Sequence, residues 1–170
     1  MSKKHLIILL TVISSATQSR AESPNLGQPF QDAAVAATIL TDGTGLPEGF
    51  GNAQTGEALF QTHCMACHGA EGHSGLNDQL IGGQGTLATA NPVKTVGSYW
   101  PYATTLFDYI NRAMPYQAPG SLKPNEIYAV TAYILYKNEI IAVDKELNAN
   151  SLAKVIMPNR ENFIWKFKEK

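Results

Sequence analysis

Cysteine is scarce in this chain, with only two among 170 residues, at positions 64 and 67. Because both fall in one short motif, the sequence excludes a disulfide framework. Basic residues are scattered, which argues against a nucleic-acid interface. The apolar stretch near the N-terminus, Leu6–Ile13, is far shorter than the roughly 20 residues that span a bilayer. The few cysteines, the scattered basic residues and the short apolar stretch favour a small globular protein whose two cysteines belong to a functional motif.

The N-terminal residues have the pattern of a secretory signal peptide. Lys3 and Lys4 precede the apolar stretch, and Ser19-Arg20-Ala21 matches a small-x-small cleavage site. We expect residues 1–21 to be removed and the protein to be periplasmic, with a retained membrane anchor as the alternative. Residues 22–51 are expected to form an arm packed on a domain over 52–138, and residues 139–170 a tail packed on the same domain. A disordered arm is the alternative for 22–51.

The central motif is Cys64-Met65-Ala66-Cys67-His68. On a helical turn, positions i, i+3 and i+4 share one face, so both thiols and the imidazole point the same way. C-x-x-C-H is the attachment signature of haem c, in which two thioethers hold the ring and the histidine binds iron. The motif therefore predicts one covalent haem c on Cys64 and Cys67, with His68 as axial ligand. A redox-active C-x-x-C pair would need a thioredoxin-like setting, which the sequence does not show.

Helical periodicity predicts three main helices, over Ala53–His63, Tyr102–Ala113 and Pro124–Asn138. The glycine-rich stretch 80–87 lacks the Lys-Ser/Thr ending of a phosphate-binding loop. We expect its glycines to approach the porphyrin closely.

The second axial ligand decides between an electron carrier and an open catalytic iron. Met114 is the leading candidate because it stands before a proline in the loop between two helices. Met157, His63, His73 or an open position remain alternatives. Trp100, next to Tyr99, is a candidate hydrogen-bond donor to a haem propionate, although an ordinary core role is as plausible.

The order of these features resembles a class I cytochrome c: an attachment helix, C-x-x-C-H, glycine-rich loops, a Met-Pro loop and a helix containing Ala-Tyr-Ile-Leu. The resemblance implies an all-α fold with three to five helices around one haem c, here with an N-terminal arm and a C-terminal tail. It also implies that the first and last helices cross, with Gly56 and Phe60 against Tyr133 or Tyr136. Residues 95–135 further resemble the cytochrome c subunit of Sox-type sulfane (sulfite) dehydrogenases. Larger members of that group carry two haem domains, whereas this chain has one C-x-x-C-H motif.

That resemblance implies a monohaem electron-transfer protein that is not itself an enzyme. Its first partner would be the molybdenum-containing (molybdopterin) subunit of a dehydrogenase that oxidises a sulfur compound. Its second partner would be a downstream electron acceptor. No nucleic-acid partner is expected, and no membrane span after signal cleavage. The alternative is a haem enzyme with its own catalytic iron, of thiosulfate-oxidising or peroxidase-like type.

Overall fold

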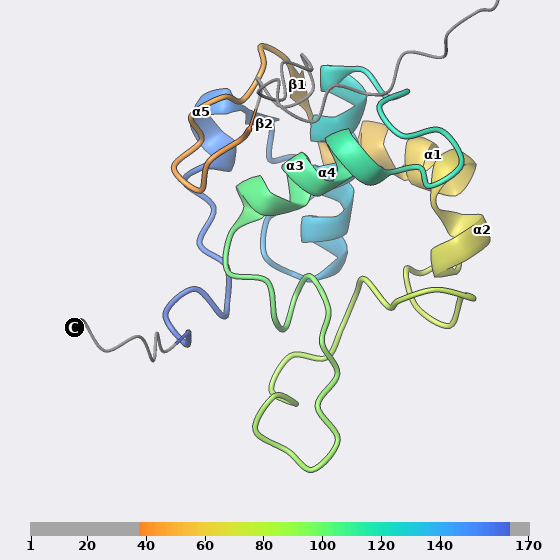
Figure 1. The fold of residues 1–170 in the computed structure, drawn as a ribbon, viewed down its shortest axis with the longest axis vertical. Coiled ribbons are helices and arrows are strands. Elements are labelled where there is room, and N and C mark those ends of the chain that lie inside the picture. Colours follow the sequence, from red (N-terminus) through yellow and green to blue (C-terminus); the bar gives the residue numbers. More distant parts are fainter. Residues whose placement is uncertain (1–37, 164–170) are drawn as a thin grey trace, which may run out of the picture. The chain divides into compact units, whose positions relative to one another are not determined.

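The computed structural model describes residues 38–163, so the predicted signal peptide and most of the predicted arm lie outside the described residues. The elements are β1 Phe50–Gly51, α1 Ala53–His63, α2 Met65–His68, α3 Ala103–Ala113, α4 Pro124–Lys137, β2 Leu147–Asn148 and α5 Ala149–Leu152 (Figure 1). The three helices predicted from periodicity are confirmed to within one residue at each end. Within residues 38–163, no helix is long and apolar enough to cross a membrane.

Helices α1 and α4 cross at a glycine. The Asn52 side chain caps α1 by accepting a hydrogen bond from the Thr55 N–H at 3.0 Å. One turn into the helix, a Cβ on Gly56 would stand 2.0 Å from the Ala129 carbonyl oxygen of α4. The rings of Phe60 and Tyr133 then meet with their centroids 5.1 Å apart. The crossing implied by the resemblance is therefore present, and Tyr133 makes the aromatic contact.

Helix α3 also packs against α4, where Phe107 and Tyr128 lie with ring centroids 4.5 Å apart. Both rings are fully buried. Helix α3 ends at Ala113, and the backbone of Met114 is extended because the following Pro115 disfavours the helical region. Helix α4 starts with Pro124 and is covered on almost every side, which explains why its apolar residues are not confined to one stripe.

Two short strands join segments that are far apart in sequence. Strand β1 pairs antiparallel with β2, with Phe50 opposite Asn148 and Gly51 opposite Leu147. Leu147 is fully buried. After α5, Met157 is buried in the same core, and the Asn159 side chain donates a hydrogen bond to the Tyr99 carbonyl at 2.7 Å. The described part of the 139–170 segment thus contributes to the hydrophobic core.

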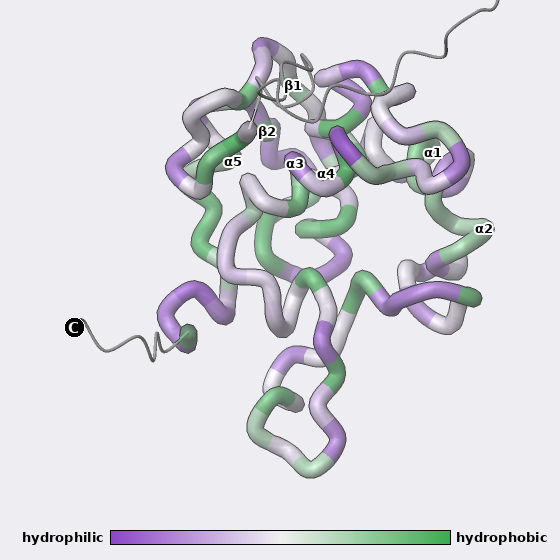
Figure 2. Tube along the Cα trace, in the orientation of Figure 1, coloured by the Kyte–Doolittle hydropathy of each residue, from purple (hydrophilic) through white to green (hydrophobic). Residues whose placement is uncertain are grey.

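A long loop connects α2 to α3 and extends away from the helices (Figure 1). Figure 2 shows apolar residues next to hydrophilic ones along it, as expected for a chain without regular structure. Asn138, at the end of α4, ties this loop to the core. Its side chain donates to the Leu80 carbonyl at 3.1 Å and accepts from the Gly82 N–H at 2.9 Å. The loop is therefore fixed at the point where it passes the helix end.

Candidate functional site

Helix α1 leads directly into the C-x-x-C-H turn. The Cys64 N–H still donates to the Phe60 carbonyl at 2.8 Å, and the N–H groups of Cys67 and His68 both donate to the Cys64 carbonyl. The turn is therefore a helical one, as its sequence spacing predicts. Gly69 ends it with φ +83, a conformation that side chains other than glycine rarely adopt.

The loop after the turn folds back on it and fixes the imidazole of His68. A Cβ on Gly75 would stand 2.3 Å from the Cys67 carbonyl oxygen, so only glycine allows this close approach. The fold-back brings the Asp78 carbonyl to 2.7 Å from His68 Nδ1. Because a carbonyl can only accept, Nδ1 donates this hydrogen bond, and Nε2 is the ring nitrogen left to bind a metal. The imidazole is thus held in the form that binds a metal through Nε2.

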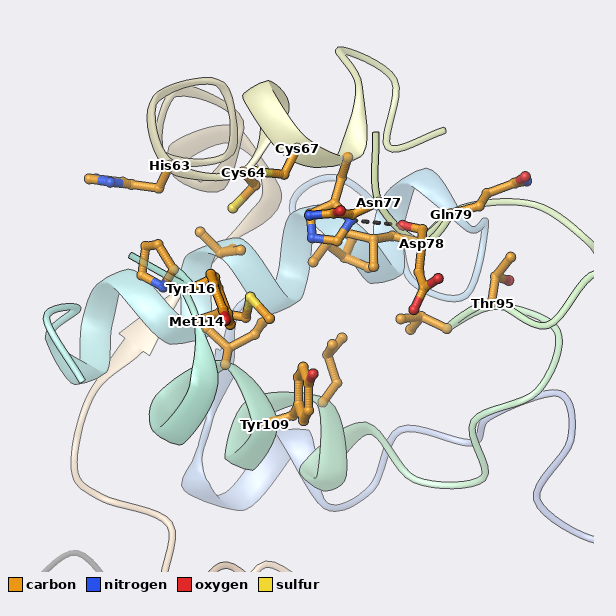
Figure 3. A pocket seen from close by; sticks show the side chains of 18 of the residues that line it. His63, Cys64, Cys67, Asn77, Asp78, Gln79, Thr95, Tyr109, Met114 and Tyr116 are labelled. Atoms are coloured by element: carbon orange, nitrogen blue, oxygen red, sulfur yellow. Dashed lines mark hydrogen bonds between the residues drawn. The ribbon is translucent and has the colours of Figure 1, made fainter. Parts of the chain in front are cut away.

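The functional candidates meet at one cavity of about 610 Å³. Figure 3 shows Cys64 and Cys67 above it, Tyr109 below it, Met114 on one side and Thr95 on the other. The walls are mainly apolar, and Cys64, between α1 and α2, is one of the lining residues. The lining side chains that the helices contribute include Cys67, His68, Leu106, Ile110, Val130 and Ile134. The structure therefore brings together the two cysteines, His68, Met114 and Trp100, which the sequence had singled out separately.

Met114 enters the cavity from the loop that follows α3. The alternatives for the second ligand lie elsewhere. Met157 is buried in the core outside the cavity, and His73 is exposed, with Nδ1 3.1 Å from Ser74 Oγ. His63 borders the cavity, but its exposed ring points away from it (Figure 3). Met114 is the best placed of the candidates.

The two aromatic candidates differ in position. Trp100 lines the cavity and contacts Tyr109 edge-to-face, with ring centroids 5.8 Å apart. Tyr99 is not part of the lining, and its ring lies under the Lys94 ammonium at 5.1 Å. Trp100 therefore remains the candidate for a polar contact inside the cavity.

The thiols lack the properties of a redox-active pair. Burial, with a smaller contribution from Cys67, raises the pKa of the Cys64 thiol to about 11. Redox-active C-x-x-C cysteines have lowered thiol pKa values instead. The two cysteines are also not joined in a disulfide. Their environment suits sulfur atoms that become part of an apolar wall.

Sequence reasoning missed two contacts of the site, and the glycines of the stretch 80–87 lie outside the cavity lining. The Asp78 carbonyl and the Gln117 amide, which donates to Cys67 Sγ at 3.9 Å, gave no signal because both depend on loop folding. Gly82, Gly83 and Gly85, which we expected near the porphyrin, do not line the cavity. A Cβ on Gly83 would stand 2.4 Å from the Val93 carbonyl oxygen, so this glycine allows the long loop to pack on itself.

Comparison with known proteins agrees with this geometry. Residues 51–134 match the family model described as cytochrome c oxidase, cbb3-type, subunit III. A chain in the crystal structure of the sulfane dehydrogenase SoxCD from Paracoccus pantotrophus is similar, with 38% sequence identity and a TM-score of 0.74. The match covers 84% of this chain and 72% of that one. The chain belongs to the cytochrome c family.

Among proteins with curated descriptions, none matches this cytochrome significantly. Cytochromes c carry haem c and transfer electrons, and the fold confirms the predicted class I arrangement. The residues of the cavity fit this cofactor. A largely apolar space holds two sulfur atoms, an oriented imidazole and a methionine, which are the groups that attach and ligate haem c.

Proposed function

We propose that this cytochrome is a periplasmic, non-catalytic electron carrier with one covalently attached haem c. Cys64 and Cys67 would form the thioethers, and His68 and Met114 would be the axial ligands. The observation that carries this proposal is that all four residues line one cavity. When bound, haem c supplies a reversible one-electron Fe(III)/Fe(II) couple.

The protein's own residues keep the site fixed. The Asp78 carbonyl orients His68, and Pro115 holds the backbone of Met114 extended at the end of α3. Leu106 and Ile110 of α3 and Val130 of α4 provide apolar walls that exclude water. A site with both ligands held in place reorganises little when an electron arrives or leaves, as electron transfer requires.

A matched pair of methionine variants tests the ligand assignment. Met114→Leu removes the sulfur at similar volume, so the holoprotein should lose the red charge-transfer band of its oxidised form and have a lower reduction potential. Its reduced form should bind carbon monoxide. Met157→Leu, the control in the core, should keep the spectrum and potential of the wild type.

An unchanged spectrum in Met114→Leu would contradict the assignment of Met114. Ready binding of carbon monoxide by the wild-type reduced protein would instead indicate an open iron, as in a haem enzyme.

The electron donor that we propose is the molybdenum-containing subunit of a dehydrogenase acting on a sulfur compound. The match to the sulfane dehydrogenase SoxCD at 38% identity supports this proposal. The test mixes the oxidised cytochrome with the separated catalytic subunit of the Paracoccus enzyme and its sulfur substrate, and follows the absorption of reduced haem. Reduction should require both the subunit and the substrate. No reduction in the complete mixture would contradict a donor of this class.

We also propose the segment assignments made from the sequence: signal peptide 1–21, arm 22–51, haem domain 52–138 and packed tail 139–170. The burial of Leu147 and Leu152 supports a tail that packs on the domain. N-terminal sequencing of the protein from a periplasmic fraction should start at Glu22. A start at Met1 in the membrane fraction would favour a retained anchor.

A further inference from the structure

The last described residues of the chain pack on the residues that lead into α3. Met157 anchors them in the hydrophobic core, where it is 1% exposed. Two residues later, the Asn159 side chain is 6% exposed and donates a hydrogen bond to the Tyr99 carbonyl at 2.7 Å. We call residues 157–163 the C-terminal segment. It contacts the core on one side and the chain that leads into α3 on the other.

The hydrogen bond from Asn159 also fixes the backbone at Trp100. The Tyr99 carbonyl belongs to the same planar peptide unit as the Trp100 N–H, so holding the carbonyl orients both. On the preceding side, the Tyr99 N–H donates to the Thr95 carbonyl at 2.9 Å. The backbone of Tyr99 is therefore bound at both of its polar groups, and the peptide plane from which Trp100 starts has one orientation.

Two side-chain contacts hold the tyrosines on either side of Trp100. The ring of Phe163 meets that of Tyr99 edge-to-face, with centroids 5.4 Å apart. The guanidinium of Arg160 lies over the Tyr102 ring, 5.4 Å from its centroid. Both geometries are favourable for these side-chain types. The C-terminal segment thus contacts the chain both before and after Trp100.

The residues that the C-terminal segment holds reach the proposed haem site. Trp100 lines the cavity and contacts Tyr109 of α3, which lines it as well. Lys94, whose ammonium lies over the Tyr99 ring at 5.1 Å, is a further lining residue. None of the described residues 157–163 lines the cavity itself. The contacts of the segment therefore reach the cavity through Tyr99 and Trp100.

We propose that the C-terminal segment positions Trp100 as a wall of the haem cavity, with Asn159 as the positioning residue. Held in place, the indole excludes water from its side of the cavity. Water beside the iron favours Fe(III), which carries more charge than Fe(II), so solvent access lowers the reduction potential. The segment thereby keeps the potential of the carrier high. The proposal rests on the proposed function, because it concerns a haem bound in the cavity.

A matched pair of asparagine variants tests the proposal in the holoprotein. Asn159→Ala removes the donor, and Asn162→Ala makes the same change at an exposed residue of the same segment. The porphyrin ring current shifts the NMR signals of a nearby indole, and those of Trp100 are identified by their loss in Trp100→Phe. In reduced Asn159→Ala they should move towards the values of free tryptophan. The equilibrium constant for reduction should fall at least about fivefold, a change within reach of one lost hydrogen bond. Asn162→Ala should match the wild type in both measurements.

A double variant separates positioning from a general loss of stability. Trp100→Phe lacks the indole, so adding Asn159→Ala should leave the equilibrium constant for reduction within about twofold of Trp100→Phe alone. An equal fall in both backgrounds would overturn the proposal, and so would unchanged indole signals in Asn159→Ala. Phe163→Ala, which removes the ring contact with Tyr99, should move the indole signals and the potential in the same direction. It decides the test if Asn159→Ala does not fold, and unchanged indole signals in it would then overturn the proposal.

The absorption spectrum separates this proposal from the proposed function. His–Met ligation in Asn159→Ala together with an unchanged potential would overturn the positioning role alone. A wild-type spectrum without methionine ligation would instead contradict Met114 as the proposed ligand. The indole signals of Trp100 would then still decide the positioning role, because they depend on the porphyrin and not on the second ligand.

Discussion

The contact between α1 and α4 at Gly56 supports a quantitative prediction for Gly56→Ala. In an isolated helix this change would stabilise the chain by about 1 kcal/mol, because alanine is the better helix former. Here the new Cβ would stand 2.0 Å from the Ala129 carbonyl oxygen, 2.6 Å from its carbonyl carbon and 2.9 Å from Tyr133 Cβ. Ordinary van der Waals contact begins near 3.4 Å.

The clash is with the backbone of α4, which cannot rotate away as a side chain could. Helices α1 and α4 must therefore move apart, and the contact between Phe60 and Tyr133 loosens with them. Overpacking of this kind costs about 1–3 kcal/mol, occasionally more. A backbone contact belongs at the upper end of that range, so after the gain in helix propensity we expect a net loss of about 2 kcal/mol. The melting temperature should fall by roughly 4–8 °C.

Urea unfolding of the holoprotein, followed by circular dichroism, measures this loss. Ala58→Gly is the control, because Ala58 is an exposed residue of the same helix. It should cost only the propensity difference of about 1 kcal/mol. A Gly56→Ala protein as stable as the wild type, or more stable, would refute the argument that α4 occupies the space beside Gly56.

Three further predictions concern loops and titration. Asn138→Leu should lower the unfolding free energy by about 2–4 kcal/mol in urea titrations, because the partly buried Gly82 N–H and the Leu80 carbonyl lose their partner. Gly75→Ala should lower the haem-to-protein ratio of purified protein, because its Cβ would meet the Cys67 carbonyl in the attachment turn. Burial raises the pKa of Tyr128 from 10 to about 12 in the folded protein, so the unfolded chain loses this proton first. Stability should therefore fall as pH rises from 10 towards 12, and Tyr128→Phe should reduce that slope in urea titrations at several pH values.

The helices were predictable because their signals are local. Asn52 caps α1, Pro124 starts α4 and Pro115 ends α3, and each acts within a few residues of its own position. The pairing of Phe50 with Asn148 was not predictable in the same way. Each strand has two residues, too few for an alternating pattern, and their pairing depends on the helices between them.

The same difference between local and long-range signals applies to the candidate site. The spacing of Cys64, Cys67 and His68 follows from one helical turn, so the motif could be recognised in the sequence alone. The partner of the imidazole could not be, because the Asp78 carbonyl belongs to the backbone and carries no residue-type signal. The contact of the Gln117 amide with Cys67 Sγ was equally hidden, since it joins segments that meet only in the folded chain.

The order of the cavity walls along the chain also matters during synthesis. Cys64 and Cys67 are made well before Met114, Val130 and Ile134, which lie on other walls of the same cavity. Until α4 has been made, the Gly56 face of α1 lacks the helix against which it packs in the folded chain. We therefore expect the two thiols to be most accessible to modification before the last long helix is in place.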